Sequence, residues 1–330
     1  METINVLVTT GIGERIIDKI TAVDERLRVH DISEMVQSEN KGDKSDKERL
    51  NALLAEADIL CGFSGPQNLI SRAPRLKWAQ MMSAGVDRLA GSELWASPVT
   101  VTNVSGVTAV SISEFVISLM LMFVKQAPLC FELKARKEWK WVNLTVLRSK
   151  TVGIIGLGSI GREVARLAKS FGMEVLATRR TVKQVKRARY VDQLLPPEQL
   201  HQLLERSDFV VLTLPLTRET NKLIGEKELS KMKSSAYLIN ISRGGIVDED
   251  ALIQALEENR IAGAGLDVFA TEPLPPDSKL WDLENVIFSP HASGGMEDYM
   301  LQAIDVFIKN LKRYLQGKKL INIVDKRNGY

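Results

Sequence analysis

The sequence predicts an α/β protein with two doubly wound, mostly parallel sheets, and three observations support this prediction. The chain has 330 residues, which at roughly 150 residues per domain suggests two domains. Short runs rich in aliphatic and β-branched residues alternate with amphipathic segments along both halves of the chain. Such alternation implies parallel strands whose connecting helices cover the faces of the sheet.

The first series of apolar runs lies in the N-terminal third of the chain. It predicts strands at Asn5–Thr9, Leu27–Ile32, Asp58–Gly62, Leu76–Met82 and Val99–Val104. Helices are predicted between them at Glu14–Ile20 and Lys47–Ala57. The polar stretch Gln37–Lys47 predicts a mobile loop.

A second alternating series begins near Thr151. It predicts strands at Thr151–Ile155, Glu174–Thr178, Phe209–Leu214, Tyr237–Ile241, Gly263–Val268 and Val286–Ser289. The predicted helices are Ile160–Phe171, Glu198–Glu205, Glu226–Met232 and Glu249–Glu257. A last amphipathic pattern at Met296–Leu315 predicts a terminal helix, but the pattern does not identify the sheet on which it packs.

Composition narrows the class of protein. The 44 Lys and Arg residues and 41 Asp and Glu residues are spread along the chain, without the basic block expected of a nucleic-acid-binding protein. Cys61 and Cys130 are too few for a disulfide framework, which favours a cytoplasmic protein. The most apolar stretch, Phe115–Val124, is too short to cross a bilayer. We therefore expect no membrane partner. No cluster of Cys and His suggests a metal site, so we expect no bound metal.

A glycine fingerprint opens the second series. Gly156, Gly158 and Gly161 form a G-x-G-x-x-G pattern that follows a predicted strand and begins a predicted helix. These glycines would permit, in turn, a tight turn, the approach of a pyrophosphate, and close packing of helix on strand. The N–H groups of Ser159 and Ile160 would face the anion at the positive end of the helix. The pattern therefore predicts a Rossmann-like dinucleotide site.

The end of the next predicted strand favours NADP(H) as the dinucleotide. NAD sites usually place an acidic residue there, which binds the ribose hydroxyls. This chain has Thr178, Arg179 and Arg180 instead, and two guanidiniums would attract a 2′-phosphate. The alternative is a solvated basic loop, because further Lys and Arg residues follow up to Arg187. We expect a preference for NADP(H), with NAD(H) possible.

Side chains suited to acid–base and anion chemistry stand at three further strand ends. Arg243 follows one strand, Asp267 and Glu272 follow the next, and His291 follows the last. In an open α/β sheet, ligands bind at the carboxyl ends of the strands. Each residue alone could be a surface cation, a loop carboxylate or a capping group. Their joint occurrence favours a site.

The chain resembles the D-isomer-specific 2-hydroxyacid dehydrogenase family over nearly its whole length. This family includes glyoxylate/hydroxypyruvate reductases, D-lactate dehydrogenases and phosphoglycerate dehydrogenases. The most specific stretches are TVGIIGLGSIGREVARLAKSFGMEV (151–175), INISRGGIVDEDAL (239–252), GLDVFATEPLP (265–275) and SPHAS (289–293). Several independent signatures in the right order make the resemblance specific.

The resemblance implies a role for each of these side chains. Arg243 would bind the substrate carboxylate and polarise the 2-oxo group. His291 would be the general acid in reduction and the base in oxidation, and Glu272 would hydrogen-bond His291 and fix its tautomer. Asp267 would contact the nicotinamide side of the cofactor. Hydride would pass between the nicotinamide and C2 of a small 2-oxo or 2-hydroxy acid.

The resemblance also implies how the chain is divided. A dinucleotide-binding domain, residues 103–295, would be inserted into a substrate-binding domain of residues 1–102 and 296–330. In the substrate-binding domain, backbone N–H groups of Ser83, Ala84 and Gly85 would bind the substrate carboxylate. Many relatives have glycine where Ser83 stands, so the loop geometry stays open.

The segment Gln126–Lys150 resembles the arm with which relatives embrace a second subunit. A homodimer is therefore expected, and whether Trp139 or Trp141 reaches the partner's pocket stays open. The expected function is an NADP(H)-preferring reductase of small 2-oxo acids such as glyoxylate or hydroxypyruvate. The alternatives are a corepressor-like protein that senses NAD(P) on the same fold, and a phosphoglycerate dehydrogenase.

Overall fold

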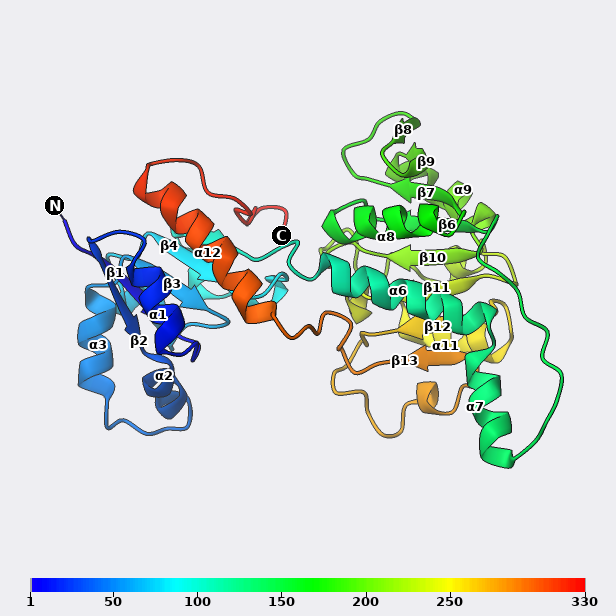
Figure 1. The fold of residues 1–330 in the computed structure, drawn as a ribbon, viewed down its shortest axis with the longest axis horizontal. Coiled ribbons are helices and arrows are strands. Elements are labelled where there is room, and N and C mark those ends of the chain that lie inside the picture. The colour runs from blue at the N-terminus through cyan, green and yellow to red at the C-terminus, as the bar shows by residue number, and fades with distance from the viewer. Residues whose placement is uncertain (1, 330) are drawn as a thin grey trace. The chain divides into compact units, whose positions relative to one another are not determined.

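The computed structural model describes residues 2–329, which form two α/β units (Figure 1). Unit 1 extends to Val107 and resumes at Glu297, whereas unit 2 is the continuous segment Thr108–Met296. The predicted fold class, two doubly wound parallel-sheet domains, is confirmed. The assignment of substrate binding to one unit and cofactor binding to the other stays a prediction.

Unit 1 contains a five-stranded parallel sheet in the order β2-β1-β3-β4-β5. Its strands are β1 (Ile4–Val8), β2 (Leu27–Asp31), β3 (Ile59–Gly62), β4 (Trp78–Met81) and β5 (Thr100–Thr102). Its helices are α1 (Glu14–Thr21), α2 (Ser33–Asn40), α3 (Lys47–Ala55), α4 (Leu69–Arg72), α5 (Glu93–Ala96) and α12 (Tyr299–Leu315). All residues of β3 and β4 are buried, as expected of central strands covered on both faces.

The terminal helix α12 belongs to unit 1, which the sequence pattern had left open. Phe307 of α12 packs on the ring of Trp78 in β4. Asn310, which is fully buried, donates its amide to the side-chain oxygen of Gln80 at 3.2 Å and to the carbonyl of Ile321 at 3.0 Å. Because buried polar groups need partners, this network ties α12 to the first sheet.

The prediction of a loop over Gln37–Lys47 is wrong in its first part, because α2 continues to Asn40. Val36 is buried, and Arg72 of α4 donates a hydrogen bond to the carboxylate of Glu39 at 2.9 Å. These contacts come from distant parts of the sequence. Tertiary contacts of this kind stabilise a short helix whose local composition is polar.

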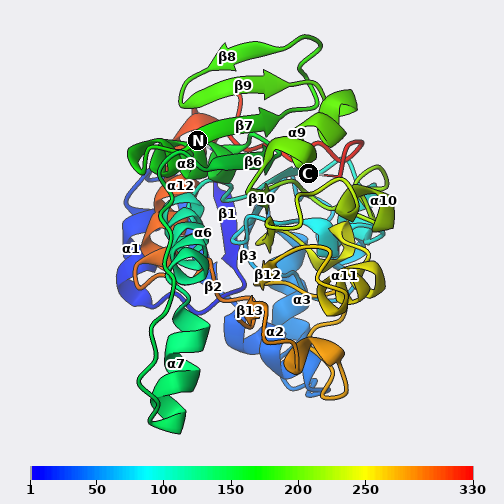
Figure 2. The same ribbon diagram turned by 90° about the vertical axis from the view of Figure 1, so that its right-hand side faces the viewer.

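Unit 2 contains an eight-stranded sheet in the order β13-β12-β11-β10-β6-β7-β9-β8, and Figure 2 shows β6, β7, β9 and β8 in succession. Only β8, at one edge, is antiparallel to its neighbour. The strands are β6 (Thr151–Ile155), β7 (Glu174–Thr178), β8 (Lys186–Ala188), β9 (Val191–Leu195), β10 (Phe209–Leu212), β11 (Tyr237–Asn240), β12 (Gly263–Leu266) and β13 (Val286–Phe288). The helices are α6 (Ala109–Val124), α7 (Ala127–Arg136), α8 (Ser159–Ser170), α9 (Leu200–Arg206), α10 (Glu226–Leu229) and α11 (Glu249–Glu257).

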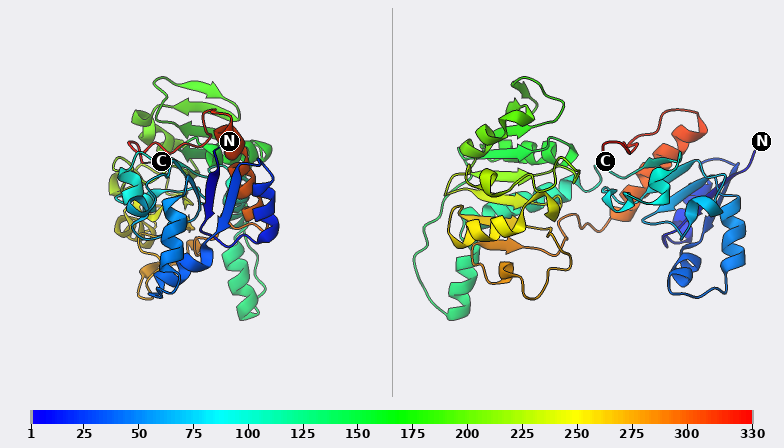
Figure 3. Two further views of the ribbon diagram at one scale, coloured as in Figure 1. Left: turned by 90° about the vertical axis from the view of Figure 1, so that its left-hand side faces the viewer. Right: turned by 180° about the vertical axis from the view of Figure 1, so that it is seen from behind.

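Helices cover both faces of this second sheet. On one face, α6 and α8 lie side by side, and Val116 and Val164 share a core with Val211 of β10 (Figure 1). On the other face, α9, α10 and α11 form a second core with Val210, and the yellow α11 is seen there from behind (Figure 3). This layering leaves the loops at the carboxyl ends of the strands to carry function.

The sequence patterns did not predict α7, β8 or β9. Among the described residues, no single helix is long and apolar enough to cross a membrane. The pair α6 and α7, bent by 60°, reaches that length and composition only when both helices are taken together.

Candidate active site

The glycine fingerprint lies where β6 ends and α8 begins. Gly156 has a left-handed backbone with φ of +101°, and a side chain there would crowd Leu214. A Cβ at Gly161 would collide with the carbonyl of Gly156 and lie 2.9 Å from Thr213 Oγ1. At Gly158, by contrast, a Cβ would meet no atom within 4 Å. The backbone is therefore tight on both sides of one open position.

The start of α8 fits a pyrophosphate. Gly158 is the N-cap residue, and no side chain caps the helix. The N–H groups of Ser159 and Ile160 belong to the first turn, where helical N–H groups lack an intrahelical partner. The positive end of the helix macrodipole lies at the same place. These donors and the open space at Gly158 match the needs of a dinucleotide phosphate.

The two predicted arginines follow the carboxyl end of β7, on the same side of the sheet as the glycine loop. Thr178 ends β7, and its carbonyl accepts the N–H groups of Gly156 at 3.3 Å and Leu157 at 3.1 Å. Arg179 and Arg180 follow at once and are both exposed. Because β6 and β7 are parallel neighbours, the guanidiniums and the glycine loop emerge from adjacent strand ends.

Sequence reasoning missed a further guanidinium in the loop after β10. The pKa of Glu219 lies below its usual value, first because Thr217 donates a hydrogen bond to it and also because Arg180 and Arg218 are nearby. Arg180 and Arg218 therefore both lie near one carboxylate. The signal that could have found Arg218 is its place after a strand that adjoins β6.

Glu272 and His291 are hydrogen-bonded at the carboxyl ends of β12 and β13. His291 Nδ1 lies 2.8 Å from Glu272 Oε2, and the N–H of Phe269 donates to Glu272 Oε1 at 3.1 Å. The carboxylate therefore binds one ring nitrogen and leaves Nε2 for another partner. The His291 side chain is 44% exposed, so Nε2 can exchange a proton with a bound molecule.

Arg243 lies at the end of the neighbouring strand, β11. Its backbone is extended, and its carbonyl accepts the side-chain amide of Asn240 at 3.0 Å. A Cβ at Gly244 would collide with the backbone of Phe269. The turn that carries Arg243 therefore packs directly on the loop that leads to Glu272.

Asp267 is buried, whereas Arg243 is partly exposed and His291 is exposed. Its side chain is buried, with 1% of the residue exposed. Its carboxylate accepts hydrogen bonds from Ser289 Oγ at 2.5 Å and from the N–H of Ala292 at 2.7 Å. The contact of Asp267 with a nicotinamide stays a prediction.

The predicted carboxylate-binding loop of unit 1 has its carbonyl groups engaged and its N–H groups available. The N–H groups of Ser83, Ala84 and Gly85 donate to no other described residue. The carbonyls of Met82, Ala84 and Gly85 accept hydrogen bonds from Tyr299 Oη (2.5 Å), Asn103 Nδ2 (2.8 Å) and Ser83 Oγ (2.8 Å), respectively. The Ser83 hydroxyl therefore bonds within the loop and leaves its backbone donors for an anion.

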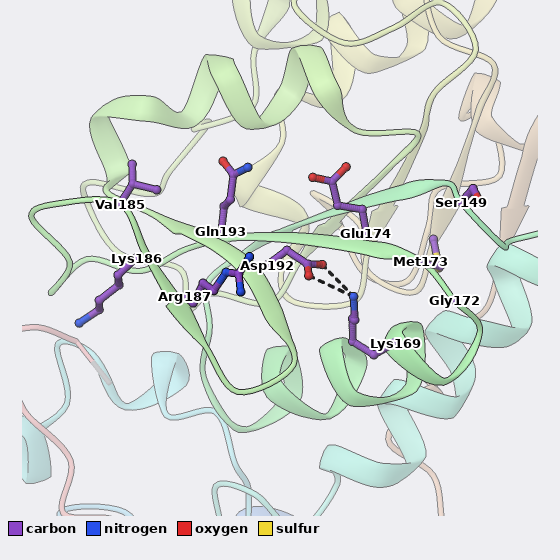
Figure 4. A pocket seen from close by; sticks show the side chains of 10 residues that line it. All are labelled: Ser149, Lys169, Gly172, Met173, Glu174, Val185, Lys186, Arg187, Asp192 and Gln193. Carbon is purple, nitrogen blue, oxygen red and sulfur yellow. Dashed lines mark hydrogen bonds and ion pairs between the residues drawn. The ribbon is translucent and has the colours of Figure 1, made fainter.

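A cavity of about 650 Å³ in unit 2 lies away from these residues (Figure 4). Glu174 begins β7 there, and Asp192, in β9, accepts a hydrogen bond from Lys169 at 3.0 Å. These are the amino ends of the strands, whereas the glycine loop and Arg243 follow carboxyl ends. This cavity is therefore not the candidate active site.

Comparison with known proteins decides the family. A family model described as the NAD binding domain of D-isomer specific 2-hydroxyacid dehydrogenases matches residues 117–293. The chain belongs to this family. It is an NAD(P)-dependent oxidoreductase of the 2-hydroxyacid dehydrogenase type, so the resemblance noted in the sequence is confirmed.

Several relatives of this dehydrogenase carry reductase names. A glyoxylate reductase from Korarchaeum cryptofilum is 36% identical over 77% of this chain and 77% of its own length. Glyoxylate/hydroxypyruvate reductase B from Pectobacterium carotovorum is 38% identical over 82% of this chain and 87% of its own. A D-3-phosphoglycerate dehydrogenase from Methanocaldococcus jannaschii is 33% identical over 86% of this chain, but the match covers only 54% of that protein.

Solved structures resemble this dehydrogenase along the whole chain. A family member from Xanthobacter autotrophicus, in complex with NADPH and MES, has a TM-score of 0.84 and 29% identity, covering 99% of this chain and all of that one. The NADPH-dependent glyoxylate/hydroxypyruvate reductase from Sinorhizobium meliloti, in complex with NADP and sulfate, has a TM-score of 0.82 and 27% identity at the same coverage.

Proposed function

We propose that this dehydrogenase is an NADP(H)-preferring reductase of small 2-oxo acids such as glyoxylate or hydroxypyruvate. The observation that carries the proposal is the 2.8 Å hydrogen bond between Glu272 and His291, at the sheet edge that also carries Arg243. The names of the relatives support the substrate class. The exposed arginine pair after β7, and the NADP(H) bound in two similar structures, support the cofactor.

Each side chain of the site has a defined task in this proposal. Arg243 binds the substrate carboxylate and polarises the 2-oxo group, because a guanidinium offers paired donors to both. Glu272 fixes His291 through Nδ1, so that Nε2 of the imidazolium delivers a proton to the oxygen on C2. In oxidation the neutral imidazole takes the proton back. The bound nicotinamide supplies or accepts the hydride. The N–H groups of Ser83–Gly85 also bind the acid group.

Exchanging both Arg179 and Arg180 for Ala is expected to raise the KM for NADPH about 10- to 100-fold, because charge-assisted hydrogen bonds to the 2′-phosphate are lost. The KM for NADH should change little, since NADH lacks that phosphate. Steady-state kinetics with both cofactors measure this difference.

The matched control for this double variant exchanges Lys183 and Arg187, two cations of the same basic segment, for Ala. It should leave both KM values unchanged. An equal rise with NADPH in the control would make the segment a general basic surface. Equal or better use of NADH by the unmodified enzyme would overturn the NADP(H) preference.

Gly158 and Gly161 are expected to differ sharply when each is changed to Ala. Gly161→Ala should lower Tm, because its Cβ would overpack the strand–helix contact at a cost of about 1–3 kcal/mol. Gly158→Ala should leave Tm unchanged, because its φ of −87° suits alanine and the space is empty. It should nevertheless weaken NADPH binding, because the methyl group would occupy the phosphate position.

Thermal unfolding without cofactor and NADPH titration by protein fluorescence measure the two effects. Each variant is the control for the other. Unchanged NADPH affinity in Gly158→Ala would argue against a pyrophosphate at this loop.

We also propose that the enzyme is a homodimer formed through the arm Gln126–Lys150. Phe131, Trp139 and Trp141 are 65%, 102% and 92% exposed in the single chain. A second copy related by a two-fold axis would bury such side chains. Light scattering of the intact enzyme tests this proposal, which a monomeric mass would contradict.

A further inference from the structure

We infer that Asp267, with Ser289 and Ser293, positions His291 for proton transfer by holding the histidine loop, residues 289–295, in one backbone conformation. The inference rests on the proposed function of His291. It gives Asp267 a task on the polypeptide itself, in addition to any contact with a cofactor.

The backbone of His291 needs such support. Its φ of +52° lies in the left-handed region, which a residue with a Cβ adopts only at an energetic cost. Its N–H group donates to the carbonyls of Asp267 at 2.8 Å and Ser289 at 3.0 Å. A disfavoured conformation persists only where the surroundings enforce it, and such places cluster at functional sites.

The carboxylate of Asp267 holds the backbone around His291 through four hydrogen bonds. Oδ1 accepts the Ser289 hydroxyl at 2.5 Å and the N–H groups of Ala292 at 2.7 Å and Ser293 at 3.1 Å, and Oδ2 accepts the Ser293 hydroxyl. All these donors flank His291.

Because Asp267 is buried, its carboxylate depends on the donors of the histidine loop as much as the loop depends on the carboxylate. A carboxylate that is 1% exposed is costly unless donors compensate for the lost water. If the histidine loop moved away, Asp267 would lose its donors and remain buried. Movement of the loop would therefore cost free energy, and this cost holds the loop against Asp267.

A second contact fixes the far end of the same loop. Ser111 Oγ, in the first turn of α6, lies 2.9 Å from the carbonyl of Ser293 and 2.8 Å from that of Gly295. Glu272 holds the imidazole ring, and Asp267 and Ser111 hold the backbone of the loop. These contacts together constrain the orientation of His291 Nε2. Proton transfer requires such fixed geometry, since misplacement by about 1 Å can cost on the order of 100-fold in rate.

The test uses Ser289→Ala and Ser293→Ala in the full chain, with Ser289→Thr as the variant that keeps the hydroxyl. Ser207→Ala is the matched control, because Ser207 is buried in the same unit and donates to the Leu203 carbonyl at 2.6 Å, on α9. We expect kcat to fall roughly 10- to 100-fold in Ser289→Ala and in Ser293→Ala. The KM for NADPH should stay unchanged, and Ser289→Thr should keep most of kcat.

A second readout does not depend on activity. The chain has three histidines, so imidazole NMR signals can be assigned with the variant His291→Asn. The His291 signal should shift or broaden in both Ala variants, while those of His30 and His201 should not. Ser207→Ala should lower Tm without changing kcat or the His291 signal.

Opposite results are equally definite. Normal kcat and an unchanged His291 signal in both Ala variants would overturn the inference. A raised KM for NADPH with normal kcat would overturn it too, by assigning the cluster to the cofactor. If His291→Asn itself retained full activity, the proposed function would fail instead, and the two failures are therefore distinguishable.

Discussion

Replacing His291 with Asn is expected to lower kcat for 2-oxo acid reduction by about 10²- to 10⁴-fold, the usual contribution of a positioned general acid. Asn cannot deliver a proton to the oxygen on C2. The KM for the acid should change much less, because the variant retains Arg243, the proposed ligand of the carboxylate. The loss of NADPH absorbance under steady-state conditions measures both constants.

The chain offers a close control for this variant. His201 lies in the same unit and is also paired with a carboxylate, Glu228, at 3.1 Å. It lies on α9 (Leu200–Arg206), and its carboxylate partner is on α10 rather than in the loop that carries Glu272. His201→Asn should keep kcat. A kcat in His291→Asn within a small factor of the unmodified enzyme would refute the assignment of the general acid.

Replacing Arg243 with Ala is expected to lower kcat/KM for the acid by about 10²- to 10⁴-fold, because two hydrogen bonds to a charged group are lost at about 1.5–3 kcal/mol each. Arg243→Lys should recover only part of this loss, since an ammonium lacks the fork geometry that matches a carboxylate. Adding guanidinium to Arg243→Ala should restore some activity. Kinetics over a range of acid concentrations separate the effects on KM and kcat.

Arg206→Ala is the control for charge alone, because Arg206 lies in the same unit and pairs with Glu174 at 2.7 Å. It should leave kcat/KM unchanged. Normal kcat/KM in Arg243→Ala would remove Arg243 from the site. An unmodified enzyme that binds NADPH but turns over no 2-oxo acid would instead favour the alternative of a dinucleotide-sensing protein.

The local patterns of the second unit predicted several of its elements closely, although they missed α7, β8 and β9. The strands Thr151–Ile155 and Glu174–Thr178 and the helix Glu249–Glu257 have the predicted bounds. Buried parallel strands are short apolar runs, and glycine marks where the chain turns, so these features are written in neighbouring residues. Gly172 follows α8 with φ of +74°, the left-handed conformation in which helices commonly end.

The parallel-sheet class, the glycine loop and the candidate residues Arg243, Glu272 and His291 could be predicted from the sequence, because each of these three residues stands in a segment that follows an apolar strand. The packing of α12 on the first sheet and the hydrogen bonds between Asp267 and the histidine loop became evident only in the folded chain. The physical reason is distance along the chain: Asn310 meets Gln80, and Asp267 meets Ser293, only after folding. Hydrogen bonds between such distant residues leave no periodic signal in the sequence.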